Sequence, residues 1–206
     1  MIDIIYNELL SRYPVLNECA EDIMKAYKAI EKCYLGGGKL LCCGNGGSAA
    51  DSDHLVGELM KGFLKKRPLS KAEKEAFGDD YAAENLQKGL PAISLCAHSA
   101  LMTAFENDAV PALVFAQQVY AYAKKEDVLI GFSTSGNSQN VVYALEAAKA
   151  SGIVSIAVTG RKESRCSALA DICIRLPETE TFKIQELTLP VYHCLAAMIE
   201  DKFFEE

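Results

Sequence analysis

Residues 128–149 have the sequence VLIGFSTSGNSQNVVYALEAAK, an apolar run followed by a hydroxyl-rich loop and a helix-like segment. The continuous apolar run at 128–132 is typical of a parallel strand that is buried on both faces. The apolar spacing within 141–149 is typical of a helix. A strand that leads through a loop into a helix is the repeating unit of α/β proteins. This stretch therefore predicts an α/β fold with a polar loop at a strand-to-helix turn.

The loop Ser133–Ser138 packs four hydroxyl side chains, one amide and one glycine into six residues. At a helix N-terminus, free N–H groups and the helix dipole attract an anion, and phosphate is the obvious candidate. The loop contains no Lys or Arg, so neutral hydrogen bonds would do most of the holding. Alternatively, the Ser and Asn side chains only cap the helix and shape a turn.

Four more apolar runs predict strands at 39–43, 91–95, 154–158 and 172–176. Helix-like segments fall between the runs, at 49–62, 111–124 and 138–150. This alternation predicts a doubly wound α/β sheet with right-handed crossovers. Two helices near 2–12 and 16–35 precede the sheet, and Gly36–Gly38 ends the second of them. An amphipathic helix near 182–203 closes the chain.

The chain has 206 residues, half of them apolar, which fits one domain with a substantial core. We expect residues 1–35 to pack on this domain and to take part in oligomer contacts, and residues 36–206 to form the domain itself. Within the domain, residues 64–90 are charged and punctuated by Pro68, Gly78 and Gly89. They predict a solvent-exposed excursion with a helical piece after Ser70, not a second domain.

The net charge of −7 argues against broad nucleic-acid binding. No apolar run approaches the roughly 20 residues of a membrane helix, and no signal peptide is evident. The eight Cys residues show no Cys-x-x-Cys spacing. We therefore expect reduced thiols and a cytoplasmic location.

A second strand–loop–helix unit contains Gly44-Asn45-Gly46-Gly47-Ser48. Glycines let the backbone approach a ligand closely and adopt positive φ angles. Ligands of open α/β sheets bind at the carboxyl ends of the strands, where both loops would lie. His54 and Glu58 follow at i, i+4, so they share one helix face. This spacing suits a shared metal or an acid/base pair, and it equally suits a surface ion pair.

The last helix carries Gln185 and His193, eight residues apart. They differ by about 80° around the helix and by about 12 Å along it, so they could line one cleft. Pro190 lies between them and makes a kink plausible. Taken alone, His193 is typical of a partly buried histidine with satisfied hydrogen bonds.

Together, the motifs resemble the sugar isomerase (SIS) domain family, in its phosphoheptose isomerase branch. The resemblance spans about residues 30–200 and rests on Gly44–Ser48, His54 with Glu58, Asn107-Asp108, Ser133–Ser138, Thr159-Gly160, and Gln185-Glu186 with His193. It implies a flavodoxin-like five-stranded parallel sheet and a homotetramer whose active sites form between subunits. It also implies interconversion of sedoheptulose 7-phosphate and D-glycero-D-manno-heptose 7-phosphate.

The resemblance further implies roles for individual residues. Phosphate would be bound by hydroxyl groups of Ser48, Ser133, Thr134, Ser135 and Ser138. The other matched positions would contact or border the sugar: Asn45, Gly46, Asn107, Asp108 and Gln185. Glu58 matches the catalytic carboxylate and His193 the catalytic imidazole. The zinc-ligand set described for some members matches His54, Glu58, Gln185 and His193.

The chemistry of this reaction defines what those groups must do. Moving a carbonyl between C2 and C1 requires removal of a carbon-bound proton through an ene-diol. Glu58 is the candidate base for that proton, and His193 the candidate acid or base for the oxygens. A carboxylate partly shielded from water, with a raised pKa, would suit this task.

Three departures from the family pattern bear on substrate identity. The excursion at 64–90 is longer than in the typical enterobacterial-type isomerase and is a candidate lid or subunit contact. His98 and Phe182 stand where the family often has Asp. Two alternatives stay open: a non-catalytic SIS-domain protein, either a sugar-phosphate sensor or an adaptor in replication initiation, and an isomerase of another sugar phosphate.

Overall fold

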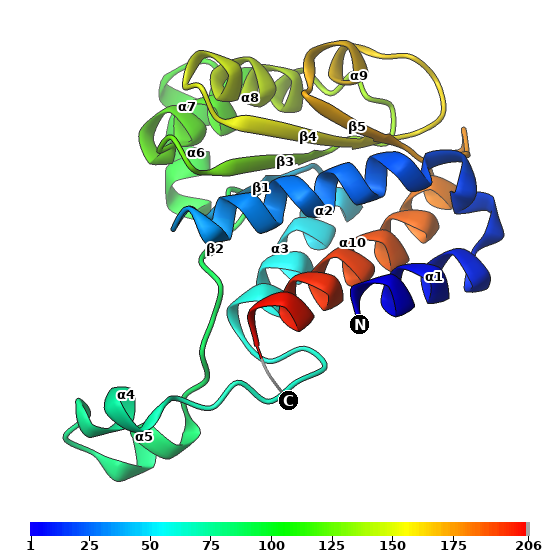
Figure 1. Cartoon of the computed structure of the whole chain (residues 1–206). Helices are drawn as coiled ribbons and strands as arrows, with labels where there is room; N and C mark the ends of the chain where they lie inside the picture. The colour runs from blue at the N-terminus through cyan, green and yellow to red at the C-terminus, as the bar shows by residue number, and fades with distance from the viewer. Residues whose placement is uncertain (205–206) are drawn as a thin grey trace.

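The computed structural model describes residues 1–204 and contains one parallel five-stranded sheet (Figure 1). Its strands lie in the order β2-β1-β3-β4-β5. All five predicted strands are confirmed: β1 (Leu40–Cys43), β2 (Ala92–Ser94), β3 (Val128–Phe132), β4 (Val154–Thr159) and β5 (Ile172–Arg175). The expected single-domain α/β fold is therefore present.

Helices cover both faces of the sheet, which explains why the strands are continuously apolar. Leu40 and Cys42 of β1 face α2 (Ala20–Leu35), α3 (Gly47–Met60) and α10 (Thr181–Phe203). Leu41 and Cys43 face the opposite core, which includes α7 (Val114–Tyr122), α8 (Gln139–Ala150) and α9 (Arg165–Leu169). Figure 1 shows these two helical layers on either side of the strands. Alternate side chains of one strand thus enter two separate cores.

The predicted N-terminal helices are α1 (Ile2–Arg12) and α2, joined by a 3-10 turn at Pro14–Cys19. Helix α1 packs along α10. Helix α2 ends where expected, because Gly37 adopts a φ of 76° immediately after it. The helix predicted at 111–124 is divided into a short turn, Pro111–Leu113, and α7. Helix α6 (Ser99–Asp108) was not predicted from the sequence.

Helix α10 runs unbroken through Pro190 and so shows no interruption between Gln185 and His193. None of the helices within residues 1–204 combines the length and apolarity that crossing a bilayer requires. All eight cysteines are free.

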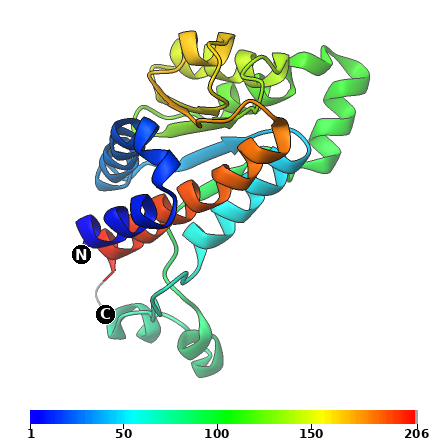
Figure 2. The same cartoon turned by 90° about the vertical axis from the view of Figure 1, so that its right-hand side faces the viewer.

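The charged excursion forms an arm, which we define as residues 61–89. Its outer part, residues 70–86, is called the head and contains α4 (Lys71–Glu75) and α5 (Asp80–Asn85). Ser70 caps α4 through a capping box with Glu73, which confirms the helical piece predicted after Ser70. Figures 1 and 2 show from two sides that the head projects away from the rest of the chain.

Candidate functional site

The two Gly- and Ser-rich loops adjoin at the point where the strand order reverses. The chain passes from β1 to β2 on one side of β1 and to β3 on the other. Such a switch point is where open α/β sheets bind ligands. Gly44–Ser48 follows β1, and Ser133–Ser138 follows β3. The side-chain amides of Asn45 and Asn140 bridge the two units with reciprocal hydrogen bonds of 2.9 and 2.8 Å.

The hydroxyl groups of Ser133–Ser138 do not cap helix α8. Ser138 occupies the N-cap position but makes no side-chain capping bond. Its Oγ instead accepts a hydrogen bond of 3.0 Å from Ser133 Oγ. Gly136 has a φ of 64°, and a Cβ there would lie 2.0 Å from Ser164 Oγ, so only glycine fits the turn. This arrangement favours the anion-binding interpretation over simple capping.

A cavity of about 270 Å³ adjoins this loop. Thr134, Ser135 and Asn137 line one side of it, and Arg161 and Lys162 line another. The sequence analysis missed these two cations, because it expected the loop at 133–138 to bind an anion through neutral hydrogen bonds. The signal was nevertheless present, because both residues come directly after the carboxyl end of β4. Arg161 also pairs with Glu18 at 2.9 Å.

Helices α3 and α10 bring His54, Glu58 and His193 together. His54 Nε2 lies 3.0 Å from Glu58 Oε1, and the ring centroids of His54 and His193 are 4.9 Å apart. The Glu58 side chain is only 12% exposed, whereas that of His54 is 44% exposed, so the carboxylate half of the pair is shielded from water. Lys61 Nζ donates to Glu58 Oε2 at 2.8 Å.

Tyr192 is a second neighbour of His54 that sequence reasoning missed. Its hydroxyl lies 2.9 Å from His54 Nδ1, and its side chain is buried. With Glu58 on Nε2, both ring nitrogens of His54 have partners, so the orientation of the imidazole is fixed. Tyr192 has apolar neighbours in the sequence of α10, so the sequence alone gives no sign that it is more than an aromatic residue of the core.

The raised pKa that would suit a catalytic carboxylate is not found at Glu58. Burial does raise the pKa of this carboxyl, but hydrogen bonds and charge from Lys61 and His54 lower it below its usual value overall. Glu58 is therefore ionised at neutral pH. Burial, and then the charge of His54, lower the pKa of His193, although Glu58 opposes the shift. His193 is therefore a neutral imidazole at neutral pH.

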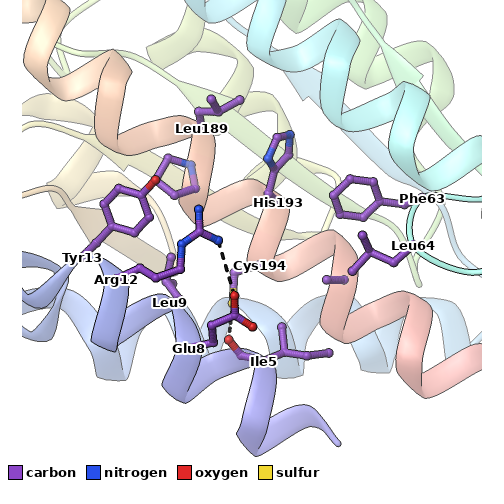
Figure 3. A pocket seen from close by; sticks show the side chains of 12 residues that line it. Ile5, Glu8, Leu9, Arg12, Tyr13, Phe63, Leu64, Leu189, His193 and Cys194 are labelled. Atoms are coloured by element: carbon purple, nitrogen blue, oxygen red, sulfur yellow. Dashed lines mark hydrogen bonds and ion pairs between the residues drawn. The ribbon is translucent and has the colours of Figure 1, made fainter.

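His193 is not a histidine with satisfied hydrogen bonds. Its Nε2 is buried, and no partner for it exists within residues 1–204. The side chain lines an apolar cavity of about 340 Å³ between α1 and α10, together with Leu9, Leu189 and Phe63 (Figure 3). We call this the α1–α10 cavity. An imidazole nitrogen left without a partner is free to bind a substrate oxygen or a metal.

Other predicted residues lie nearer the loops or apart from the cluster. Gln185 contacts the Gly-rich loop, since a Cβ on Gly47 would come 2.5 Å from its Nε2. Ser48 is buried at the start of α3, and Gly46 has a φ of 57°. Asn107 and Asp108 are exposed, and Asn107 Nδ2 donates to Asp108 Oδ1 at 2.7 Å. That bond does not tie either residue to the loops.

The proposed zinc ligands share donor types that zinc accepts. Among residues 1–204, however, no three His, Cys, Asp or Glu side chains are gathered so as to hold a metal ion. The His54 nitrogens and the Glu58 oxygens are engaged with neighbouring side chains. The unpartnered His193 Nε2 is the donor that fits a ligand best.

Comparison with known proteins places the chain in a family. Residues 7–160 match the model of the SIS domain. The phosphoheptose isomerase of Rhodospirillum rubrum is 37% identical over 186 residues, which cover 90% of this chain and 88% of the relative. That of Aneurinibacillus thermoaerophilus is 37% identical over 179 residues, with 87% and 80% covered. The solved phosphoheptose isomerase of Neisseria gonorrhoeae superimposes with a TM-score of 0.76 at 30% identity, covering 95% of each chain. The chain therefore belongs to the SIS domain family, in the branch of the phosphoheptose isomerases.

Proposed function

We propose that this protein is an aldose–ketose isomerase that converts sedoheptulose 7-phosphate to D-glycero-D-manno-heptose 7-phosphate. One observation carries the proposal beyond family membership: a buried, ionised carboxylate lies in one cluster with an imidazole whose Nε2 has no hydrogen-bond partner within residues 1–204. A sugar-binding protein without catalytic activity needs neither group in that state. The pair is what proton transfer between adjacent carbons demands.

The phosphate end of the substrate is assigned to Ser48, Ser133, Thr134, Ser135 and Ser138. The N-terminus of α8 follows this loop directly, and its dipole favours an anion there, while Arg161 and Lys162 line the cavity beside Thr134 and Ser135. Asn45 and Gln185 adjoin these loops and are assigned to the sugar hydroxyls. Binding the remote phosphate orients the reacting carbons.

Glu58 acts as the base in the proposed mechanism. It takes a proton from C1 of the ketose, and the O2 carbonyl gains a proton, which gives the ene-diol. Glu58 then returns its proton to C2 while O1 loses its own proton. His193 serves the two oxygens: the N–H of the neutral imidazole gives O2 its proton in the first step, and the ring takes the O1 proton back in the second, so it ends neutral. The lowered pKa of Glu58 keeps this base ionised at neutral pH.

A homotetramer with active sites between subunits, and a cytoplasmic location, belong to the same proposal. His193 faces the α1–α10 cavity, whereas the phosphate loop adjoins a different one. A neighbouring subunit that covers the α1–α10 cavity would complete the walls around His193. The eight free thiols suit a reducing compartment.

Incubating the purified protein with sedoheptulose 7-phosphate tests the proposal directly. NMR should detect the aldose product growing with enzyme concentration. Arabinose and hexose phosphates, assayed in parallel, test the alternative substrates. Absence of turnover on every sugar phosphate, with binding retained, would favour the non-catalytic alternative.

The double variant Ser133→Ala/Ser135→Ala is expected to raise KM by roughly 10²–10⁴-fold, because hydrogen bonds to a charged group contribute about 1.5–3 kcal/mol each and two of them are lost. The change in kcat should be small, since these hydroxyls hold the substrate far from the reacting carbons. Initial rates over a range of substrate concentrations give both constants. Ser151→Ala, at the opposite end of α8, is the matched control and should behave like the parent protein. An unchanged KM in the double variant would contradict the assignment of the substrate phosphate to this loop.

Zinc is the metal in this proposal, with His54, Glu58, Gln185 and His193 as its ligands. When bound, it would polarise the substrate carbonyl. Elemental analysis after dialysis against zinc should find metal in the parent protein and little in His54→Ala or His193→Ala. His98→Ala is the control, since the third histidine faces Tyr122 at a ring distance of 5.9 Å. Equal metal content in all four proteins would contradict the assignment.

A further inference from the structure

We propose that the arm of each chain docks on a second copy of this chain. Phe77, Tyr81 and Leu86 of the head would pack over the α1–α10 cavity of that copy. The proposal concerns an interaction surface and does not depend on the isomerase activity. Its experiments therefore succeed or fail independently of any turnover.

The root of the arm is held by a buried ion pair. The Arg67 side chain is 0% exposed and that of Glu200 is 1% exposed, and Arg67 Nε donates to Glu200 at 2.8 Å. The remaining guanidinium nitrogens donate to the carbonyls of Leu59 at 2.6 Å and Glu58 at 3.2 Å. Arg67 therefore joins the end of α3 to the end of α10.

Backbone groups reinforce the same anchor. The N–H groups of Phe63, Leu64 and Lys65 all donate to the Glu200 carboxylate, at 2.8, 2.7 and 3.0 Å. The segment that returns from the head is bonded to the outgoing segment as well, since Lys88 N donates to Arg67 O at 2.7 Å. These bonds fix the base of the arm and so set the direction in which it leaves the end of α3.

The head has almost no core of its own. Ala83 is the only buried residue in α4 and α5. Tyr81 is 79% exposed, Leu86 47% and Phe77 42%. Helices of five and six residues are marginal in water without packing against other structure. An anchored arm that ends in exposed apolar side chains thus has the properties of a docking element.

Within residues 1–204, the rest of the chain does not cover the apolar side chains of the head. In both views the head stands apart from the sheet and from α1 and α10 (Figures 1 and 2). Its ion pairs, Lys74 with Glu84 and Lys88 with Glu73, stay within the arm. The apolar side chains therefore face solvent in a single chain.

The α1–α10 cavity is the best-matched surface, because the arm begins at its edge. Phe63 and Leu64 of the arm form one wall, opposite Leu9 and Leu189 (Figure 3). Arm and cavity thus occupy one face of the molecule. A two-fold dimer requires this arrangement, since each arm that meets the partner's cavity must leave its own cavity free for the partner's arm.

A cation at the rim of the cavity is compatible with the same pairing. Arg12 stands there with its side chain 64% exposed and pairs with Glu8 at 3.5 Å. An ion pair this exposed contributes little stability, so the guanidinium can also meet a second carboxylate. Asp80 adjoins Tyr81 in the head and makes no ion pair within residues 1–204. Docking would bring this carboxylate toward the guanidinium while the Tyr81 ring packs over the mouth of the cavity. Tyrosine suits such a position because it combines an apolar ring with a polar tip.

Photo-crosslinking tests the contact. Tyr81 is replaced by p-benzoylphenylalanine in the full chain, and ¹⁴N- and ¹⁵N-labelled proteins are mixed, equilibrated and irradiated. We expect mixed-isotope cross-links from position 81 to residues 2–12 or 181–203. The same probe at Tyr120, which is 76% exposed on α7, is the control and should give none. Cross-links only within one chain, to another surface, or not at all would overturn the proposal.

Sedimentation supplies the second measurement. Phe77→Ser/Tyr81→Ser/Leu86→Ser should weaken self-association by at least about tenfold, or lower the oligomeric state, while circular dichroism stays unchanged. Tyr120→Ser is the matched control and should associate like the parent protein. Association of the triple variant that equals the parent's across the concentration range would likewise overturn the proposal.

Discussion

Glu58→Gln is expected to lower kcat by roughly 10²–10⁴-fold, the range that a positioned acid/base group contributes. The amide keeps the size of the side chain and can still hydrogen-bond to His54, but it cannot take a proton from carbon. KM should stay close to the parent value, because the phosphate loop is untouched. Steady-state rates and a separate binding measurement by calorimetry distinguish the two effects.

The control for this variant is Glu146→Gln, a carboxylate 48% exposed on α8. It should keep full activity, which shows that loss of charge elsewhere on the chain is harmless. If Glu58→Gln also kept full activity, Glu58 would not be the base, and His193 would be the next group to test.

Arg67→Leu is expected to lower the free energy of unfolding by about 3–5 kcal/mol, since it leaves the Glu200 carboxylate buried without its cation. Arg67→Lys should retain part of the stability, because an ammonium preserves the charge but cannot make the three-nitrogen contact. Urea unfolding followed by circular dichroism, at one fixed protein concentration, measures the difference.

The neighbouring cation provides the control. Lys66 is exposed, so Lys66→Ala should change the stability by less than about 0.5 kcal/mol. Equal unfolding midpoints for Arg67→Leu and Lys66→Ala would mean that the buried pair adds nothing and that the arm is anchored by its backbone bonds alone.

The strands were predictable because helices cover both faces of the sheet, which makes β1, β3 and β4 almost uninterrupted apolar runs. Helix α6 was not predictable, since none of its ten residues is fully buried and its contact with the core is limited to partly buried apolar side chains such as Met102 and Phe105. A helix that packs little leaves little periodicity in the sequence.

The site was predictable where it follows from the rule that loops at the carboxyl ends of strands meet. That rule placed Gly44–Ser48 beside Ser133–Ser138. The contact between Tyr192 and His54 depends on how α3 packs against α10, and no local sequence pattern reveals that packing. The lowered pKa of Glu58 depends in part on Lys61, which stands three residues further on, just past the end of α3.

The close approach of Gly47 to Gln185 has a consequence for mutational scans. A methyl group at position 47 displaces only the flexible tip of Gln185, so Gly47→Ala should fold normally. The substitution instead moves the Gln185 amide out of its place beside the loop. Gln185→Ala removes the same amide, and the two substitutions together should therefore do no more harm than either one alone. The first loop and the last helix thus form one epistatic pair, and neither position can be optimised without the other.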